Sequence, residues 1–283
     1  MNFLKDLPHQ HPHELTLFFY PSPGLDWSSP WGLARSTANN KLRRKPRSIG
    51  HVSIRIKSEH SERPIDILTG MTQKHYDEGM HEVMFFGYGL GILLHDFAGE
   101  LEKPEKLAPE LIERSKTGRL SYLRFELNRT CIEKLKKYLD NYKSVGADQH
   151  YGMPHRPLKG EGGGCSAFGA SFIEVLGLMK DEYFKNWTRT FNMPKKLIGG
   201  PNTGKYVSPL HMYWHGRQWA KDDEEHIQGF FWDPDLMHNW CVDTWKSDQE
   251  HSKIFLKEQW HESHGLVLKQ HDHTPIDTPL FQK

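Results

Sequence analysis

Residues 160–178 read GEGGGCSAFGASFIEVLGL, a glycine-rich loop followed by a run of small and apolar residues. Glycine permits an abrupt backbone turn and leaves the next side chain sterically open. The run from residue 165 to residue 178 predicts a buried helix, with Gly177 near its end. Cys165 therefore stands where a loop becomes a helix. The unpaired N–H groups and the positive partial charge of a helix N-terminus stabilise a thiolate.

Cys165 is the candidate nucleophile on this pattern. The backbone N–H groups of Cys165 and Ser166 are expected to bind the oxyanion of a tetrahedral intermediate. The alternative is a small buried cysteine that fills a tight helix contact. We favour this alternative for Cys131, which lies in an amphipathic helix, and for Cys241, which lies among tryptophans. Only Cys165 follows a glycine-rich loop.

A nucleophilic cysteine needs a base within hydrogen-bond reach, and that base can be distant in sequence. Residues 50–57, GHVSIRIK, alternate in the manner of a strand. Three apolar side chains share one face: Val52, Ile54 and Ile56. The other face carries His51, Ser53, Arg55 and Lys57. His51 opens this strand after a glycine and is the candidate base, although the chain has 19 histidines and a surface histidine at a strand start is the alternative.

The remaining pattern predicts an α+β fold, an antiparallel sheet with packed helices. Further strands are expected at residues 14–20, 65–72 and 120–127, and residues 83–97 are apolar and more typical of a strand than of a helix. A loop containing Trp27 and Trp31 is expected up to about residue 48. Thr130 and Glu133 have capping-box spacing at the start of a helix. Its apolar stripe is Ile132, Leu135, Leu139 and Tyr142.

The character of the chain changes at about residue 181. Five tryptophans lie between Trp187 and Trp240, with many charged residues and no clear period. We expect residues 1–180 to form the catalytic domain and residues 181–283 to form a Trp-rich extension packed on it. The tryptophans expected to make this contact are Trp187, Trp214, Trp232 and Trp240. A second small domain is the alternative.

Two of these motifs together resemble a known family. GHVSIRI at residues 50–56, followed much later by GGGCSAFGASFIEVLGL at residues 162–178, is similar to the circularly permuted NlpC/P60 group of papain-like enzymes. In that group the histidine strand precedes the cysteine helix, as it does here. The resemblance covers about residues 48–178 and implies a papain-like fold with Cys165 as nucleophile and His51 as general base. The group includes peptidoglycan peptidases and amidases, and relatives that are lecithin:retinol acyltransferase-like lipid enzymes.

The family also uses a third polar residue, on the strand after the histidine, to orient the imidazole. A hairpin centred near residues 60–61 would return residues 71–73 opposite His51. Gln73 is the predicted third residue because its amide oxygen could accept the imidazole N–H. The sequence departs from the family in lacking an obvious Asn, His or Glu at a diagnostic spacing. The alternatives are Thr69, Thr72 and His75.

A second motif, GGPNTGK at residues 199–205, fits the phosphate-loop pattern G-x-x-x-x-G-K. Tyr206 stands where a Ser or Thr would meet magnesium, and Pro209 prevents a long helix from following. We therefore expect a tight turn here and no nucleotide site.

Histidines gather near both ends of the chain, as HQHPH at residues 9–13 and as HESHG and HDH within residues 261–273. Close-set histidines can bind zinc or nickel. Neither cluster has H-E-x-x-H spacing or a matched set of cysteines, so no metal and no cofactor is predicted.

The composition of the chain limits the classes of partner that we expect it to bind. Lys and Arg number 37 against 36 Asp and Glu, so charge gives no argument for nucleic acid or an anionic membrane. The basic run at residues 41–47 is interpreted as a solvated loop. No stretch approaches the roughly 18 apolar residues of a membrane span, so no integral membrane association is expected. Three cysteines form no disulfide framework. No signal peptide is visible, and the compartment stays open: cytoplasmic as given, cell envelope if a leader was removed.

The sequence thus predicts a soluble cysteine hydrolase that cleaves an amide bond. The expected substrate is a peptide, a peptidoglycan fragment or another amide or ester. Two alternatives remain: a non-catalytic binding module on the same fold, and a lipid acyl hydrolase or transferase.

Overall fold

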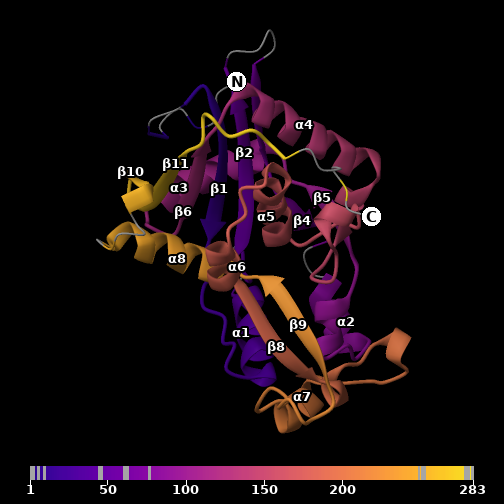
Figure 1. Cartoon of the computed structure of the whole chain (residues 1–283). Coiled ribbons are helices and arrows are strands. Elements are labelled where there is room, and N and C mark those ends of the chain that lie inside the picture. The colour runs from indigo at the N-terminus through magenta and orange to yellow at the C-terminus, as the bar shows by residue number, and fades with distance from the viewer. Residues whose placement is uncertain are drawn as a thin grey trace.

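The structure is a computed structural model in which residues 4, 7–8, 11–43, 47–59, 64–75, 78–247, 249, 253–276 and 281 are described. The expected hairpin turn at residues 60–61 and His9 of the first histidine cluster lie outside these ranges. Within the described residues the chain is α+β, with eight α-helices and a six-stranded mixed sheet (Figure 1). No helix in the described part is long and apolar enough to cross a membrane.

The central sheet has the strand order β10–β11–β6–β1–β2–β3. Its strands are β1 (His13–Tyr20), β2 (His51–Ser58), β3 (Ile65–Thr69), β6 (Ser121–Glu126), β10 (Leu256–Trp260) and β11 (Ser263–Lys269). All neighbours are antiparallel except β11, which runs parallel to β6. The sheet is therefore mixed and not wholly antiparallel as expected. The parallel pair is possible because residues 127–262 separate β6 from β11, so no hairpin turn joins these two strands.

Helices cover both faces of this sheet. On one face, Leu15, Leu17 and Phe19 of β1 join a large apolar cluster with α4 (Arg129–Ser144) and α5 (Cys165–Leu176). On the other face, Phe18 and Tyr20 pack with α3 (Pro104–Ser115). Both faces being covered explains why every residue of β2 is buried, including the polar ones.

Two expected segments take a different form. The loop expected before residue 48 contains helix α1 (Pro30–Leu42), because Ser29 caps the N–H of Gly32 and Pro30 occupies the first turn, where a missing N–H is tolerated. Residues 83–97 are not a strand. They hold the end of α2 (Glu78–Phe85) and the 3₁₀ helix η1 (Leu90–Leu94), and strand β5 (Phe97–Leu101) begins only at their last residue.

Two further boundaries shift. The strand expected at residues 65–72 is interrupted at Gly70, so β3 is followed by a separate strand, β4 (Met71–Gln73). Helix α4 begins before Thr130, since the Asn128 side chain accepts the N–H of Cys131 and is the N-cap.

After residue 181 the chain first forms a protruding hairpin and then returns to the main sheet as β10 and β11 (Figure 1). The elements are α6 (Asp181–Trp187), β8 (Thr188–Pro194), α7 (Pro209–His215), β9 (His226–Trp232) and α8 (Pro234–Lys246). Trp187 and Trp240 lie in the core and Trp232 packs against it. The expectation for Trp214 is wrong, because its exposed fraction is 61% on the outer surface of α7.

A small sheet of β4, β5 and β7 (His150–Tyr151) lies beside the start of β2. In it Met71 pairs with Leu101, and Phe97 pairs with Tyr151. The remaining 3₁₀ turns are η2 (Ala147–Gln149), η3 (Pro157–Lys159), η4 (Lys195–Leu197) and η5 (Pro201–Thr203). This small sheet carries Glu102 and Tyr151 towards the N-terminus of α5.

Candidate active site

Helix α5 lies close against β2 because a glycine faces the strand. A Cβ at Gly169 would stand 2.6 Å from Cγ1 of Val52, so only glycine allows this approach without a shift. Cys165 lies four residues before Gly169 and hence on the same side of the helix. The close contact therefore places the Cys165 side chain over the start of β2, where His51 lies.

The loop before Cys165 is held by its glycines. Gly162 has a φ of +103°, and a Cβ there would collide with the carbonyl oxygen of His150. The N–H of Gly163 donates to the same oxygen at 3.1 Å. Gly164 is the N-cap of α5, and it has no side chain that could accept a hydrogen bond from the first N–H groups of the helix. These are the N–H groups of Cys165 and Ser166 that the sequence assigns to an oxyanion.

The Cys165 thiol is 5% exposed and is surrounded by hydrogen-bonding groups. It interacts with the His51 side chain, the backbone N–H of Val52 and the Tyr151 hydroxyl. Burial alone would raise the pKa of the thiol. The charge of His51 and the hydrogen bonds to the sulfur outweigh burial, so the pKa of Cys165 lies below its usual value.

His51 is the second member of this group and is 3% exposed. Burial and the nearby Arg47 charge act to lower the pKa of its imidazole. The charges of Glu102 and Cys165 act in the opposite direction and prevail, so the pKa of His51 is raised. A lowered thiol pKa and a raised imidazole pKa together favour a thiolate–imidazolium pair.

Glu102 is the third member, and it follows directly after β5. Its Oε2 lies 2.6 Å from Nε2 of His51, an ion pair whose geometry falls short of a linear hydrogen bond. Burial acts to raise the pKa of Glu102, but His51 and Arg47 lower it to about 2. The carboxylate is thus ionised at neutral pH, and it favours the protonated imidazole.

Gly70, at the break between β3 and β4, leaves the space for this pair. A Cβ at Gly70 would stand 3.0 Å from Oε2 of Glu102 and 3.1 Å from Nε2 of His51. Its carbonyl also accepts the N–H of Glu102 at 2.8 Å, and the Thr69 hydroxyl donates to the Glu102 carbonyl at 3.0 Å. The backbone around the strand break therefore fixes Glu102.

Arg47 supports Glu102 from the other side. Its Nη2 donates to Oε1 of Glu102 at 2.7 Å and to Glu110 at 2.8 Å, and Arg114 also donates to Glu110. A turn closed by the Gly50 N–H donating to the Arg47 carbonyl folds this arginine back beside His51. The prediction that residues 41–47 form a solvated loop is thus wrong for Arg47. Its side chain is 15% exposed and forms ion pairs with Glu102 and Glu110.

The structure brings together Cys165 and His51, but not Gln73. The Gln73 amide lies 3.5 Å from Glu78, and the partner of the His51 ring is Glu102. Ser166 follows Cys165, and its hydroxyl donates to the carbonyl of Trp232 at the end of β9. The alternatives Thr69, Thr72 and His75 show no contact with the ring among the described interactions; Thr69 acts only through the Glu102 backbone.

The other two cysteines lie in quite different surroundings. Burial raises the pKa of Cys131, and it raises that of Cys241 to about 12. The Cys241 thiol donates to the carbonyl of Tyr122 at 3.3 Å. Both thiols are therefore poor nucleophiles at neutral pH.

The hairpin of β8 and β9 carries a separate cavity of about 390 Å³. Its wall includes Trp27, Trp219, Arg189 and Asn192, and none of Cys165, His51 and Glu102. The motif at residues 199–205 forms a tight turn, as expected, with the Gly200 N–H donating to the carbonyl of Lys205.

No family model, no curated protein and no solved structure matches this chain. The chemistry available to it lies in its own residues: a thiol, an imidazole and a carboxylate in successive contact, from α5, β2 and the end of β5. Such a series can activate a thiol and move its proton.

Proposed function

We propose that this protein is a cysteine hydrolase that cleaves an amide bond, with Cys165 as nucleophile, His51 as acid and base, and Glu102 as the residue that orients His51. The observation that supports this proposal most strongly is that the buried side chains of Cys165, His51 and Glu102 are in successive contact. In this group the pKa of Cys165 is lowered and that of His51 is raised. The order of His51 before Cys165 supports the likeness to the permuted NlpC/P60 group and a papain-like arrangement.

In the first half of the reaction the Cys165 thiolate attacks the carbonyl carbon of the amide. The His51 imidazolium donates its proton to the leaving nitrogen as the C–N bond breaks, and an acyl thioester remains on Cys165. Glu102 engages Nε2 of His51, so Nδ1 is the nitrogen left to face the sulfur and the leaving group.

In the second half His51, now neutral, removes a proton from water, which attacks the thioester and releases the acid. The backbone N–H groups of Cys165 and Ser166 stabilise the oxyanion in both halves, since the helix N-terminus directs them outward. The thiolate leaves and recovers its partnership with His51.

A specific surface feature favours a second candidate, hydrolysis or transfer of a lipid acyl group. Large apolar side chains are exposed at the end of α2, directly after it, and on the chain that follows the 199–205 turn. They are Met84, Phe85, Phe86, Tyr206, Leu210 and Trp214. Tyr206 hydrogen-bonds to the carbonyl of Met84 and Tyr88 bridges to Val207, so the two segments are adjacent. Exposed aromatic and aliphatic groups of this kind are typical of contact with a partner or a lipid surface.

Turnover assays distinguish the candidates. Wild-type protein and C165A are incubated with short peptides, peptidoglycan fragments and lipid esters in vesicles. Turnover of the amides by wild type alone supports the proposal. Turnover confined to lipid esters selects the second candidate. If Cys165 alkylates no faster than a free thiol and nothing is turned over, the protein is a binding module without this chemistry.

A further inference from the structure

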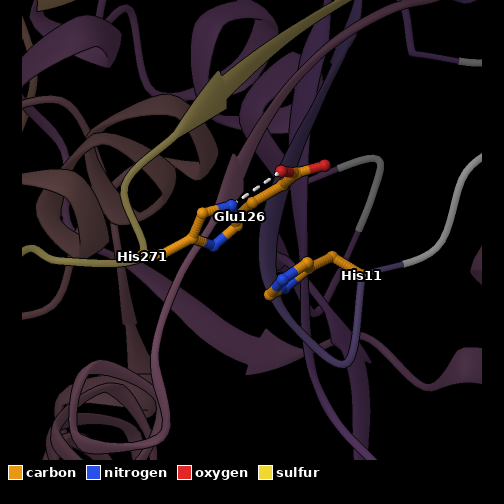
Figure 2. A group of neighbouring side chains, drawn as sticks. All are labelled: His11, Glu126 and His271. Carbon is orange, nitrogen blue, oxygen red and sulfur yellow. Dashed lines mark ion pairs between the residues drawn. The ribbon is translucent and has the colours of Figure 1, made fainter.

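Two histidines, one from each of the clusters near the ends of the sequence, meet in the fold. His11 lies just before β1, Glu126 is the last residue of β6, and His271 follows β11 by two residues. Glu126 pairs with Glu14 of β1 and with Lys269 of β11, so these three positions lie at the same end of three adjacent strands. Figure 2 shows the two histidine rings and the carboxylate gathered there.

The separation of the three side chains suits a metal ion. One ligand atom from each lies within 4.8 Å of the others. Nε2 of His271 is 3.3 Å from Oε2 of Glu126, and the His11 and His271 rings are 4.5 Å apart between centroids. Tetrahedral ligands about 2.0–2.1 Å from zinc lie about 3.4 Å from one another. A small movement of side chains that are not fully buried therefore completes the geometry.

The surroundings orient these groups as a ligand set. Nδ1 of His11 lies 2.9 Å from the carbonyl oxygen of His13 and 3.2 Å from the backbone N–H of the same residue. In the tautomer whose Nδ1 donates to the carbonyl, Nε2 carries a free lone pair for a metal ion. The backbone of His271 is held by Asn128, whose amide donates to its carbonyl at 2.9 Å, and the Gln270 N–H donates to the Glu126 carbonyl at 2.8 Å. The backbone of each of these residues is thus held in place at the end of the strands.

We propose that His11, Glu126 and His271 bind a zinc ion, with water completing the coordination. Two imidazoles and one carboxylate suit zinc, whereas magnesium and calcium prefer sets made of oxygen. Bound there, the ion joins the segment that enters β1, the end of β6 and the segment that leaves β11. The site shares no residue with the candidate catalytic group.

Titration calorimetry of the untagged, metal-free full chain with ZnCl₂ tests this site. We expect one ion per chain to bind, and His11→Ala, Glu126→Gln and His271→Ala each to weaken binding by at least about tenfold. Zinc should raise the Tm of the wild type, and it should raise the Tm of the three variants much less. MgCl₂ and CaCl₂ should give no comparable binding.

The matched control removes the other closely spaced pair, His211 and His215 on α7, whose ring centroids are 4.4 Å apart. The double variant H211A/H215A should bind zinc at this site as the wild type does. Binding that is lost in this control but kept in the three ligand variants overturns the proposal. So does equal affinity in every variant, which would mean an adventitious ion only.

Discussion

Oε2 of Glu102 lies 2.6 Å from Nε2 of His51, and both side chains are almost fully buried. The imidazole has two nitrogens, and this contact uses Nε2, which leaves Nδ1 for other partners. A carboxylate in that position fixes the plane of the ring and stabilises its charged form. Glu102 is ionised because Arg47 and His51 lower its pKa to about 2.

Glu102→Gln should therefore lower the rate of the reaction at Cys165 by about a hundredfold, because the His51 ring loses its charge partner and its fixed orientation. The matched control is Gln73→Ala, at the residue that sequence alone selected. The Gln73 amide contacts Glu78 at 3.5 Å and not the His51 ring, so this substitution should leave the rate unchanged. Single-turnover rates of acylation measure both. A larger loss in Gln73→Ala than in Glu102→Gln would contradict the assignment.

Glu102→Gln should also change how the free energy of unfolding depends on pH. The folded pKa of Glu102, about 2, is below the value of 4.5 in an unfolded chain. Its ionisation therefore stabilises the fold above about pH 4.5, and this contribution is lost as the pH falls through about 2. Glu102→Gln should cost about 3 kcal/mol at pH 7. Urea denaturation should show the gap between wild type and variant narrowing below pH 4.5. A gap that stays constant with pH would mean that the carboxylate charge is not its source.

The sequence predicted the parts of this site that local rules govern. Gly-rich residues before a small-residue helix predict the place of Cys165, and strict alternation after Gly50 predicts the strand of His51. The role of Glu102 was not predicted, because the strand at residues 65–72 was expected to continue through Gly70 and residues 83–97 were expected to be a strand. The break at Gly70 and the pairing of β4 with β5 are tertiary, and only they bring Glu102 to His51.

The spacing of the histidines near the two chain ends also could not predict that His11 and His271 are neighbours. The zinc-binding motifs considered were local in sequence, whereas His11 and His271 are neighbours only because β1, β6 and β11 adjoin in one sheet. The parallel pairing of β11 with β6 has no local sequence signal, since a parallel pair needs a long crossover.

Cys165 should alkylate with iodoacetamide at a pH well below the value of about 8.5 that is usual for a thiol. Its rate should fall only when the pH drops through the lowered pKa of Cys165. Cys131 and Cys241 should stay unmodified in folded protein because burial raises their pKa values. His51→Ala should move the profile towards that of a free thiol. Peptide mass mapping reports each site, and an unmoved profile in the variant would rule out His51 as the partner.

Gly70→Ala tests the space around the ion pair. The added methyl group would press on both Glu102 and His51, at 3.0 and 3.1 Å, so we expect the pair to separate and the alkylation profile of Cys165 to shift to higher pH. Gly79→Ala is the control, because the nearest atom to its new Cβ is Cζ of Phe97 at an ordinary 3.5 Å. Identical pH profiles for the two variants would show that Gly70 has no special role at the site.

Tyr151→Phe tests the hydroxyl that reaches the sulfur. Burial, together with the neighbouring Cys165, raises the pKa of Tyr151 well above its ordinary range, so the phenol keeps its proton and can donate it to the thiolate. A hydrogen bond to a charged group contributes about 1.5–3 kcal/mol, so its loss should raise the pKa of Cys165 by about one unit or more. The control is Tyr183→Phe in α6, which removes a buried hydroxyl that has no hydrogen-bond partner within the described part of the chain. The pH dependence of iodoacetamide labelling should shift upward for Tyr151→Phe alone; a shift of the same size in Tyr183→Phe would assign the effect to general loosening of the core and not to the hydroxyl on the sulfur.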